Sequence, residues 1–264
     1  MMLQHFGLRH APLGKDSPAL WDDGVLARLE ERFAWLLQSP GVGLITGEPG
    51  VGKTAALRQL TKGLNPHRHL ALYQPETDFG RLDLYRGLAR ALGVEPGYRR
   101  AQVWRDLKVR IQELVEGRQV LPIWIIDEAQ NLPPEFFRDL PAFLNFAFDA
   151  RDLMTIWLVG HPHLAQTLER APYAALHSRI QVRVQLRPIL ERDRFAALIQ
   201  HALKSAGCSH TLITDSGLEI MRQASKGLPR QAGRILNNAL RLAVAKGLNH
   251  LPDDLIQLAI AEMP

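Results

Sequence analysis

One short run of residues limits the possible folds of this 264-residue chain more than any other feature. Residues 47–54 read Gly-Glu-Pro-Gly-Val-Gly-Lys-Thr and match G-x-x-x-x-G-K-[ST] at every position. An apolar strand is predicted immediately before the run, at 42–46, and a helix after it, from Lys53 to Leu64. A strand, a glycine-rich turn and a helix in this order form a cradle for nucleotide phosphates, whereas a chance glycine-rich turn needs neither neighbour.

The motif predicts a separate task for each part of this loop. Gly50 and Gly52 let the backbone turn so that successive N–H groups face a phosphate, and the positive helix N-terminus adds to the attraction. Lys53 is expected to reach the β- and γ-phosphates of ATP, and the Thr54 hydroxyl to ligate Mg²⁺. The expected nucleotide-binding residues of the loop are Gly47, Glu48, Pro49, Gly50, Val51, Gly52, Lys53 and Thr54.

A second motif follows a predicted apolar strand at 123–127. It places Asp127 and Glu128 at the carboxyl end of that strand, where ligands bind in open α/β sheets. Asp127 is expected to bind the nucleotide's Mg²⁺, and Glu128 to polarise the water that attacks the γ-phosphate. An Asp-Glu pair after a strand is common by itself and is often a solvated loop pair. Together with the glycine-rich loop, it predicts nucleotide hydrolysis rather than simple phosphoryl transfer.

Strands and helices alternate through the first 188 residues. Besides 42–46 and 123–127, strands are predicted at 69–74, 154–160 and 180–186, and the helices between strands at 53–64, 81–92, 101–116 and 134–148. This alternation predicts a P-loop NTPase fold, with a parallel five-stranded sheet flanked by helices. Only helices are predicted afterwards, at 191–206, 215–225, 230–246 and 253–262. We therefore expect an α/β core with an N-terminal extension over 1–188 and a small all-helical lid domain over 189–264.

The composition is that of an ordinary globular protein, with 46% hydrophobic and 22% charged residues. The net charge of +5 permits a polyanionic partner but does not require one. The single cysteine, Cys208, excludes an internal disulfide framework and predicts a reducing compartment. The sequence shows neither a signal peptide nor an apolar run of the roughly 18–20 residues that span a bilayer. A cytoplasmic protein without a membrane partner is expected.

The helical segment after Pro188 resembles the lid of AAA+ ATPases, a superfamily of ring- or filament-forming nucleotide switches. Arg179, just before the last predicted strand, matches the arginine finger that reaches the ATP of a neighbouring subunit. Arg230 opens a lid helix in Gly-Leu-Pro-Arg and matches the second sensor, which contacts the γ-phosphate. His161 stands where the superfamily places its first sensor, although Asn or Thr is more usual there.

Each of these three positions also has a simpler interpretation. Arg179 and Arg230 also fit surface arginines of an arginine-rich chain, and His161 fits a hydrogen-bonded loop residue. A guanidinium stays charged and offers a planar fork to phosphate oxygens, which favours the functional interpretation of the two arginines. The expected catalytic residues are Glu128, Lys53, Arg179, Arg230 and His161, and Arg230 is also expected to contact the nucleotide.

Three further strings narrow the resemblance to ExeA-like ATPases. Residues 5–8, His-Phe-Gly-Leu, precede Pro12-Leu13 and are similar to the F-G-L-x-x-x-P-F start of that group, with Leu13 in place of Phe. Asp-Glu-Ala-Gln-Asn-Leu at 127–132 is typical of the group, as is Val-Gly-His-Pro at 159–162, where Gln more often precedes Pro. The group contains the secretion protein ExeA and the transposition regulators TniB, TnsC, IstB and MuB, which bind DNA with ATP and recruit or activate a transposase.

The transposition branch is the one that this sequence favours. The secretion branch adds a membrane segment and a peptidoglycan-binding module, and replication initiators add a helix-turn-helix domain after the lid. None of these is expected in this chain, which stops at the lid and is mildly basic. Contacts with DNA would then come from the ATPase core itself.

The best candidate for such contacts is the basic segment from Gly97 to Arg110. Similar regions line the DNA-facing pore of TnsC-like rings, and arginines at a helix N-terminus can hold phosphates without reading bases. The alternative is a solvated amphipathic helix whose Val103, Leu107 and Ile111 face the core. The expected DNA contacts are Arg99, Arg100, Gln102, Arg105 and Lys108.

These observations predict a slow, switch-like ATPase that uses ATP and Mg²⁺ and acts in transposition, a form of DNA recombination. It is expected to form a homo-oligomer, a ring or a helical filament, on duplex DNA without sequence preference. A transposase and a target-selection factor are the expected protein partners, and hydrolysis would dismantle the assembly. The alternative is an ExeA-like secretion or envelope-assembly ATPase that acts on proteins, and a third interpretation is a signalling switch that never touches DNA.

Overall fold

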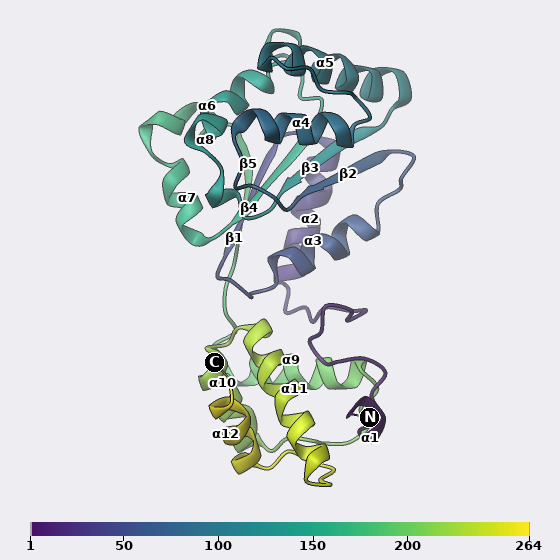
Figure 1. Cartoon of the computed structure of the whole chain (residues 1–264), viewed down its shortest axis with the longest axis vertical. Coiled ribbons are helices and arrows are strands. Elements are labelled where there is room, and N and C mark those ends of the chain that lie inside the picture. Colours follow the sequence, from purple (N-terminus) through teal and green to yellow (C-terminus); the bar gives the residue numbers. More distant parts are fainter. Residues whose placement is uncertain (1, 264) are drawn as a thin grey trace. The chain divides into compact units, whose positions relative to one another are not determined.

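The computed structural model describes residues 2–263 and divides them into two parts, each with its own hydrophobic core. The sheet part, residues 26–47 and 57–186, contains a five-stranded sheet in the order β2-β3-β4-β1-β5 (Figure 1). All neighbouring strands are parallel, as predicted. The strands are β1 (Val42–Gly47), β2 (His69–Gln74), β3 (Leu121–Ile126), β4 (Thr155–Gly160) and β5 (Ile180–Leu186).

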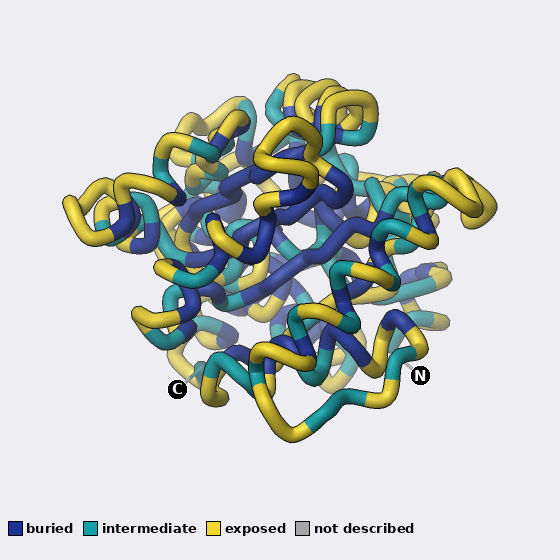
Figure 2. Tube along the Cα trace, turned by 90° about the horizontal axis from the view of Figure 1, so that it is seen from above, coloured by how far each residue is buried: buried dark blue, intermediate teal, exposed yellow. Residues whose placement is uncertain are grey.

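Helices occupy the connections between these strands and expose their outer turns, while the central strands are buried (Figure 2). The helices α2 and α4 to α8 belong to this part, and α3 ends in it. Their bounds are α2 (Val25–Gln38), α3 (Lys53–Lys62), α4 (Arg81–Ala91), α5 (Arg100–Gln112), α6 (Pro134–Phe143), α7 (Pro162–Leu168) and α8 (Ala174–His177).

Two tryptophans show that the sheet is packed on both faces. In the register of β3 and β4, Trp157 pairs with the residue after Trp124, so the two side chains point to opposite faces. Trp124 packs against Tyr85 of α4, with ring centroids 6.2 Å apart, and Trp157 stacks on Phe33 of α2 at 5.4 Å. Both tryptophans are fully buried, which fits the continuous apolar strands of a sheet covered on two sides.

A glycine in β1 makes room for Trp157. Gly43 pairs directly with Trp157, and a Cβ atom on Gly43 would lie 2.4 Å from the indole ring. We expect Gly43→Ala to lower the free energy of unfolding by about 1–3 kcal/mol, because the core would be overpacked. The Gly117→Ala variant is the control, since a Cβ there meets nothing within 4 Å. Urea unfolding measures both, and an unchanged midpoint for Gly43→Ala would contradict this close packing.

The predicted helix at 134–148 is too long. Helix α6 ends at Phe143, and Phe146 is buried with an extended backbone (φ −107°, ψ 144°). The Lys108 ammonium donates hydrogen bonds to the carbonyls of Ala142 (3.3 Å) and Asn145 (2.8 Å), at and just beyond the last turn of α6. Residues 147–149 all have positive φ, a backbone conformation that cannot continue a right-handed helix.

The helical part comprises residues 2–25, 48–56 and 187–263. The last of the boundaries between the two parts, between Leu186 and Arg187, lies next to the one expected at Pro188, whereas residues 48–56 were expected in the α/β core. Every fourth or third residue of α11 is buried, which produces one apolar face for the other helices to cover. The helices are α1 (Met2–His5), α9 (Arg192–Ser205), α10 (Asp215–Ser225), α11 (Pro229–Ala245) and α12 (Asp253–Ala261).

The N-terminal segment differs from the expected domain arrangement, which placed it with the α/β core. Phe6 and Leu8 are buried in the core of the helical part. The backbone N–H of Arg9 donates to the carbonyl of Ala206 (2.7 Å), just after α9. The apolar residues of the segment are thus used to extend the helical core. In the described residues, every helix is too short or too polar to cross a membrane.

Candidate nucleotide site

The glycine-rich loop after β1 has the backbone of a phosphate cradle. Gly50 (φ 86°) and Gly52 (φ 109°) both have the positive φ that glycine adopts without strain. Within residues 2–263, the N–H groups of these two glycines make no hydrogen bond, and a Cβ at Gly52 would meet nothing within 4 Å. Unpaired N–H groups in an open turn at a helix N-terminus suit an anion, so the loop fits the phosphates of a nucleotide.

Lys53 is the first residue of α3 and is buried, with an exposed fraction of 5%. Its ammonium donates to the carbonyl of Glu48 (3.2 Å), which bends the side chain back over the loop that it follows. An ammonium in this position adds a positive charge where the loop's N–H groups already favour an anion. Lys53 therefore fits the role predicted for it.

Arg230 lies beside the same loop. Its backbone N–H donates to the carbonyl of Gly50 (3.1 Å), and a Cβ on Gly50 would lie 2.9 Å from the Cβ of Arg230. The residue is the second of α11, where Pro229 occupies the first position, and its guanidinium has no partner among residues 2–263. Arg230 and the glycine-rich loop were predicted from two separate motifs. The structure places them in contact within the helical part.

The carboxyl ends of the central strands meet at one edge of the sheet, where the second motif lies. Asp127 directly follows β3 and is only 3% exposed. Its Oδ2 accepts a hydrogen bond from the Tyr73 hydroxyl (2.9 Å), and its Oδ1 accepts one from the backbone N–H of Glu128 (2.9 Å). The two donors hold the carboxylate in one orientation, and carboxylate oxygens are ligands that divalent cations such as Mg²⁺ prefer.

Tyr73 belongs to the neighbouring strand β2 and was not among the predicted site residues. Partial burial and its hydrogen bond to Asp127 raise the pKa of the Tyr73 hydroxyl to about 12. The hydroxyl therefore keeps its proton at neutral pH and remains a donor to Asp127. The pairing of β2 with β3 brings the two residues together. Because they lie far apart in the sequence, no local pattern indicates that Tyr73 contacts Asp127.

Glu128 has a left-handed backbone (φ 50°), which is uncommon for a residue with a side chain. The Thr77 hydroxyl donates to its carbonyl (3.0 Å), and the Gln130 amide donates to its carboxylate Oε2 (2.6 Å). The same Oε2 lies 3.4 Å from Nε2 of His161, which caps α7 at the end of β4. The structure thus brings Glu128 and His161 together as neighbours at this edge, and the sensor role of His161 stays a prediction.

Arg179 precedes β5 and lies among acidic side chains of its own chain. Its Nη2 donates to Oδ2 of Asp149 (2.7 Å), and this hydrogen bond lowers the pKa of the Asp149 carboxyl. The neighbouring Phe148 side chain is fully exposed. In the isolated chain the predicted arginine finger is therefore bound to a partner that it must leave before it can contact another subunit.

The basic segment before and along α5 contains two kinds of side chain. Arg100 forms an ion pair with Asp139, and Lys108 donates to carbonyls at the end of α6, so both contribute to packing. Gln102 folds over Gly97, where a Cβ would come within 2.6 Å of its side chain. Arg99 and Arg105 are exposed, and neither has a side-chain partner among residues 2–263. The buried face of the alternative interpretation is confirmed, since Val103, Leu107 and Ile111 are buried, while the DNA contacts stay a prediction.

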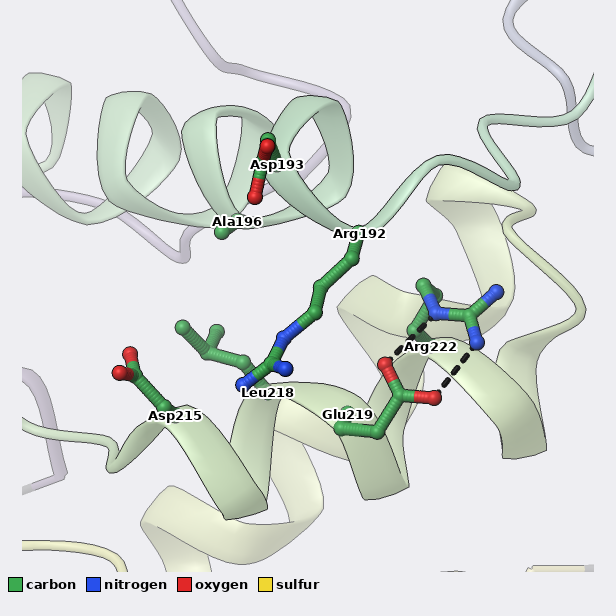
Figure 3. Close-up of a pocket in the computed structure, with 7 residues that line it drawn as sticks. All are labelled: Arg192, Asp193, Ala196, Asp215, Leu218, Glu219 and Arg222. Carbon is green, nitrogen blue, oxygen red and sulfur yellow. Dashed lines mark hydrogen bonds and ion pairs between the residues drawn. The ribbon is translucent and has the colours of Figure 1, made fainter.

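A separate pocket lies within the helical part, between α9 and α10, with a volume of about 220 Å³ (Figure 3). Within α10, Glu219 accepts two hydrogen bonds from Arg222 (2.8 and 2.5 Å), and these, together with one from Gln223, lower the pKa of Glu219 to about 2. A carboxylate held ionised in this way links neighbouring turns of α10 and does not exchange protons at neutral pH. The lining residues are Arg192, Asp193, Ala196, Asp215, Leu218, Glu219 and Arg222.

Comparison with known proteins identifies the family. A family model described as an AAA domain matches residues 36–168, slightly more than half of the chain. The chain belongs to the AAA domain family. It is accordingly a nucleotide-binding ATPase with the P-loop fold expected from its motifs. The matched range contains the glycine-rich loop, Asp127 and Glu128, and it ends at α7.

Two kinds of relative resemble this AAA domain chain. General secretion pathway protein A of Aeromonas hydrophila is 28% identical over 228 residues, which cover 84% of the chain and 41% of that protein. The match to the structure of Cdc6p from Pyrobaculum aerophilum (TM-score 0.70, 19% identity) covers 97% of this chain and 70% of the Cdc6p chain. The match to Aeropyrum pernix ORC1, solved in complex with DNA (TM-score 0.68, 18% identity), covers 94% of this chain and 66% of the ORC1 chain. The structures show the shared fold, and the chain spans less than half of the secretion protein.

The first relative agrees with the ExeA-like resemblance of the sequence, while the narrower grouping with TniB, TnsC, IstB and MuB stays a prediction. The residues of both nucleotide motifs are evident in the sequence, but the side chains that hydrogen-bond to the second motif are not. Thr77 and Gln130 were missed together with Tyr73. Only Gln130 had a signal, since it lies inside the string at 127–132.

Proposed function

We propose that this AAA domain hydrolyses ATP with Mg²⁺, using the residues of its two nucleotide motifs. Mg²⁺ would bind to Thr54 and Asp127 and would offset the negative charge of the phosphates. Lys53 and the N–H groups of the glycine-rich loop hold the phosphates, and Arg230 contacts the γ-phosphate from the first turn of α11. Glu128 accepts a proton from the attacking water. The support is the unpaired N–H groups of Gly50 and Gly52 and the two hydrogen bonds that orient the Asp127 carboxylate.

We propose further that the ATP-bound protein assembles on duplex DNA and directs a transposase to it. The observation that carries this proposal is the exposed surface at the N-terminus of α5. Tyr98 is 92% exposed there, and Arg99 and Arg105 have no acidic partner among residues 2–263. Arginines without an internal partner are available to phosphates, and a helix N-terminus adds a favourable field. A target-selection factor is a further partner in this proposal.

Salt dependence tests this surface. For about 3–4 phosphates neutralised per subunit, the logarithm of the DNA affinity should fall with the logarithm of salt at a slope of about −3. Arg99→Ala combined with Arg105→Ala should weaken binding equally for all sequences and flatten the slope by about 2. Fluorescence anisotropy with ATP and duplexes of different sequence measures both quantities.

The matched control removes the same charge at the opposite edge of the sheet. Arg68 and Arg118 are exposed beside the amino ends of β2 and β3. Arg68→Ala combined with Arg118→Ala should leave the slope within about 0.5 of the wild-type value. Equal slopes for the two double variants would contradict the assignment of the DNA surface to α5.

Assembly is proposed to place Arg179 at the ATP of a neighbouring subunit. Arg179→Ala should therefore bind ATP normally and hydrolyse it at least ~10-fold more slowly, because the transition-state charge loses a cation. Mixing it with Lys53→Ala should restore turnover, since that protein supplies an intact Arg179 to the ATP of its neighbour. Arg183→Ala, four residues further along β5, is the control and should keep full activity. Steady-state phosphate release measures the wild type, the two single variants of β5 and its approach, Arg179→Ala and Arg183→Ala, and the mixture. Full activity of Arg179→Ala as a dilute monomer would contradict the assembly model.

The secretion protein from Aeromonas hydrophila favours a second candidate, an ATPase that acts on protein partners. That candidate keeps every nucleotide-binding role proposed above and assigns the α5 surface to a protein. Binding of duplex DNA separates the two, because a protein-directed ATPase has no requirement for it. Failure of the wild-type protein to bind duplex DNA at low salt with ATP would therefore favour the second candidate.

A further inference from the structure

Gln130 connects the end of β4 to the carboxylate of Glu128. The backbone N–H of His161 donates to Oε1 of Gln130 (3.1 Å), and Nε2 of Gln130 donates to Oε2 of Glu128 (2.6 Å). The first hydrogen bond fixes the orientation of the amide, because only its oxygen can accept from an N–H group. The NH₂ end must then face Glu128, so the donor to the carboxylate is determined by the structure of the neighbouring strand.

The position of this amide depends on a glycine at the end of β4. A Cβ on Gly160 would lie 2.5 Å from Oε1 of Gln130 and 2.9 Å from Leu164. The φ of Gly160 is not in the left-handed region, so space rather than backbone conformation requires glycine here. The last residue of β4 therefore makes room for the side chain that holds Glu128.

We propose that Gln130 is a positioning residue that orients Glu128 for attack by water on ATP. This inference rests on the role of Glu128 in the proposed function. Glu128 is 46% exposed in its side chain and has a strained left-handed backbone, so its carboxylate needs an external contact to keep one orientation. Gln130 binds Oε2 and leaves Oε1 as the oxygen that takes the proton from water.

Turnover of the 264-residue chain without DNA tests this role. Gln130→Ala should lower kcat about 10- to 100-fold, because a Glu128 carboxylate that is no longer held in place takes the proton from water less efficiently. The KM for ATP should stay within about twofold. Gln130→Glu keeps the acceptor for the His161 N–H but puts a second carboxylate against Glu128, and should lower kcat at least as much. Wild-type kcat in either variant would overturn the proposal. So would an increase in kcat, which would mean that Gln130 keeps Glu128 away from water.

A double-mutant comparison separates positioning from general disruption of the site. If Gln130 acts only through Glu128, adding Gln130→Ala to Glu128→Gln should cause no further loss of kcat. A further tenfold loss would overturn the proposal. Gly160→Ala perturbs the same amide from the other side and should also lower kcat without changing KM. Thermal unfolding checks that each variant is folded.

These outcomes are distinguishable from failure of the proposed function. If Glu128→Gln by itself retains wild-type kcat, the role of Glu128 is wrong and the positioning proposal falls with it. If Glu128→Gln loses turnover and Gln130→Ala does not, only the positioning proposal is wrong. The assays contain no DNA, so their results are independent of the α5 surface.

Discussion

Lys53→Ala is expected to weaken ATP binding by a factor of about 30 to several thousand. This range corresponds to the loss of about 2–5 kcal/mol when one partner of a buried, hydrogen-bonded charge pair is removed. Lys53 is 5% exposed and lies over the glycine-rich loop, so an alanine leaves the phosphates without this cation and with no nearby replacement on α3. Isothermal titration calorimetry or displacement of a fluorescent nucleotide measures the affinity.

The control for this prediction is at the other end of the same helix. Lys62 is the last residue of α3 and is exposed, so Lys62→Ala removes an equal charge without touching the loop. It should bind ATP with wild-type affinity. An affinity of Lys53→Ala within threefold of the wild type would show that the loop does not use this ammonium for nucleotide.

Glu128→Gln is expected to keep ATP binding and to lower hydrolysis about 10²- to 10⁴-fold, the usual contribution of a positioned general base. The substitution preserves shape, and the new amide oxygen still accepts the hydrogen bond from Gln130. It removes only the ability to take a proton, so the protein should be trapped in its ATP-bound state. Single-turnover hydrolysis of labelled ATP measures the rate, while equilibrium binding confirms that the nucleotide is held.

Glu135→Gln gives the matched comparison. Glu135 is exposed in the first turn of α6, so its loss changes the charge near the same edge without reaching the second motif. Its hydrolysis rate should equal that of the wild type. Equal rates for Glu128→Gln and Glu135→Gln would mean that a different residue activates the water.

The sheet was predictable because its signals are local. Most strands are short apolar runs, such as β3 (Leu121–Ile126), and burial on both faces makes such runs continuous. The end of α6 was not predictable, because it depends on Lys108, which lies in α5 and contacts the carbonyls of Ala142 and Asn145. The position of the N-terminal segment depends in the same way on contacts of Phe6 and Leu8 with distant helices.

The nucleotide motifs were predictable for a similar reason. Gly50, Gly52 and Lys53 act through a loop whose backbone is determined by its own sequence. Tyr73 and Gln130 were not found, because their partners are set by strand pairing and by the space above Gly160. The ion pair between Arg100 and Asp139 was not predictable either, since the two residues lie on different helices, and the expected DNA contacts of the α5 surface stay a prediction.

One measurement tests the central proposal, that ATP controls binding to duplex DNA, most directly. Glu128→Gln is expected to stay loaded with ATP and can be titrated with a labelled duplex at low salt, with and without nucleotide. We expect tight binding with ATP, little binding without it, and little binding by Lys53→Ala under either condition. Equal DNA affinity of Glu128→Gln with and without ATP, or no binding in either case, would contradict it.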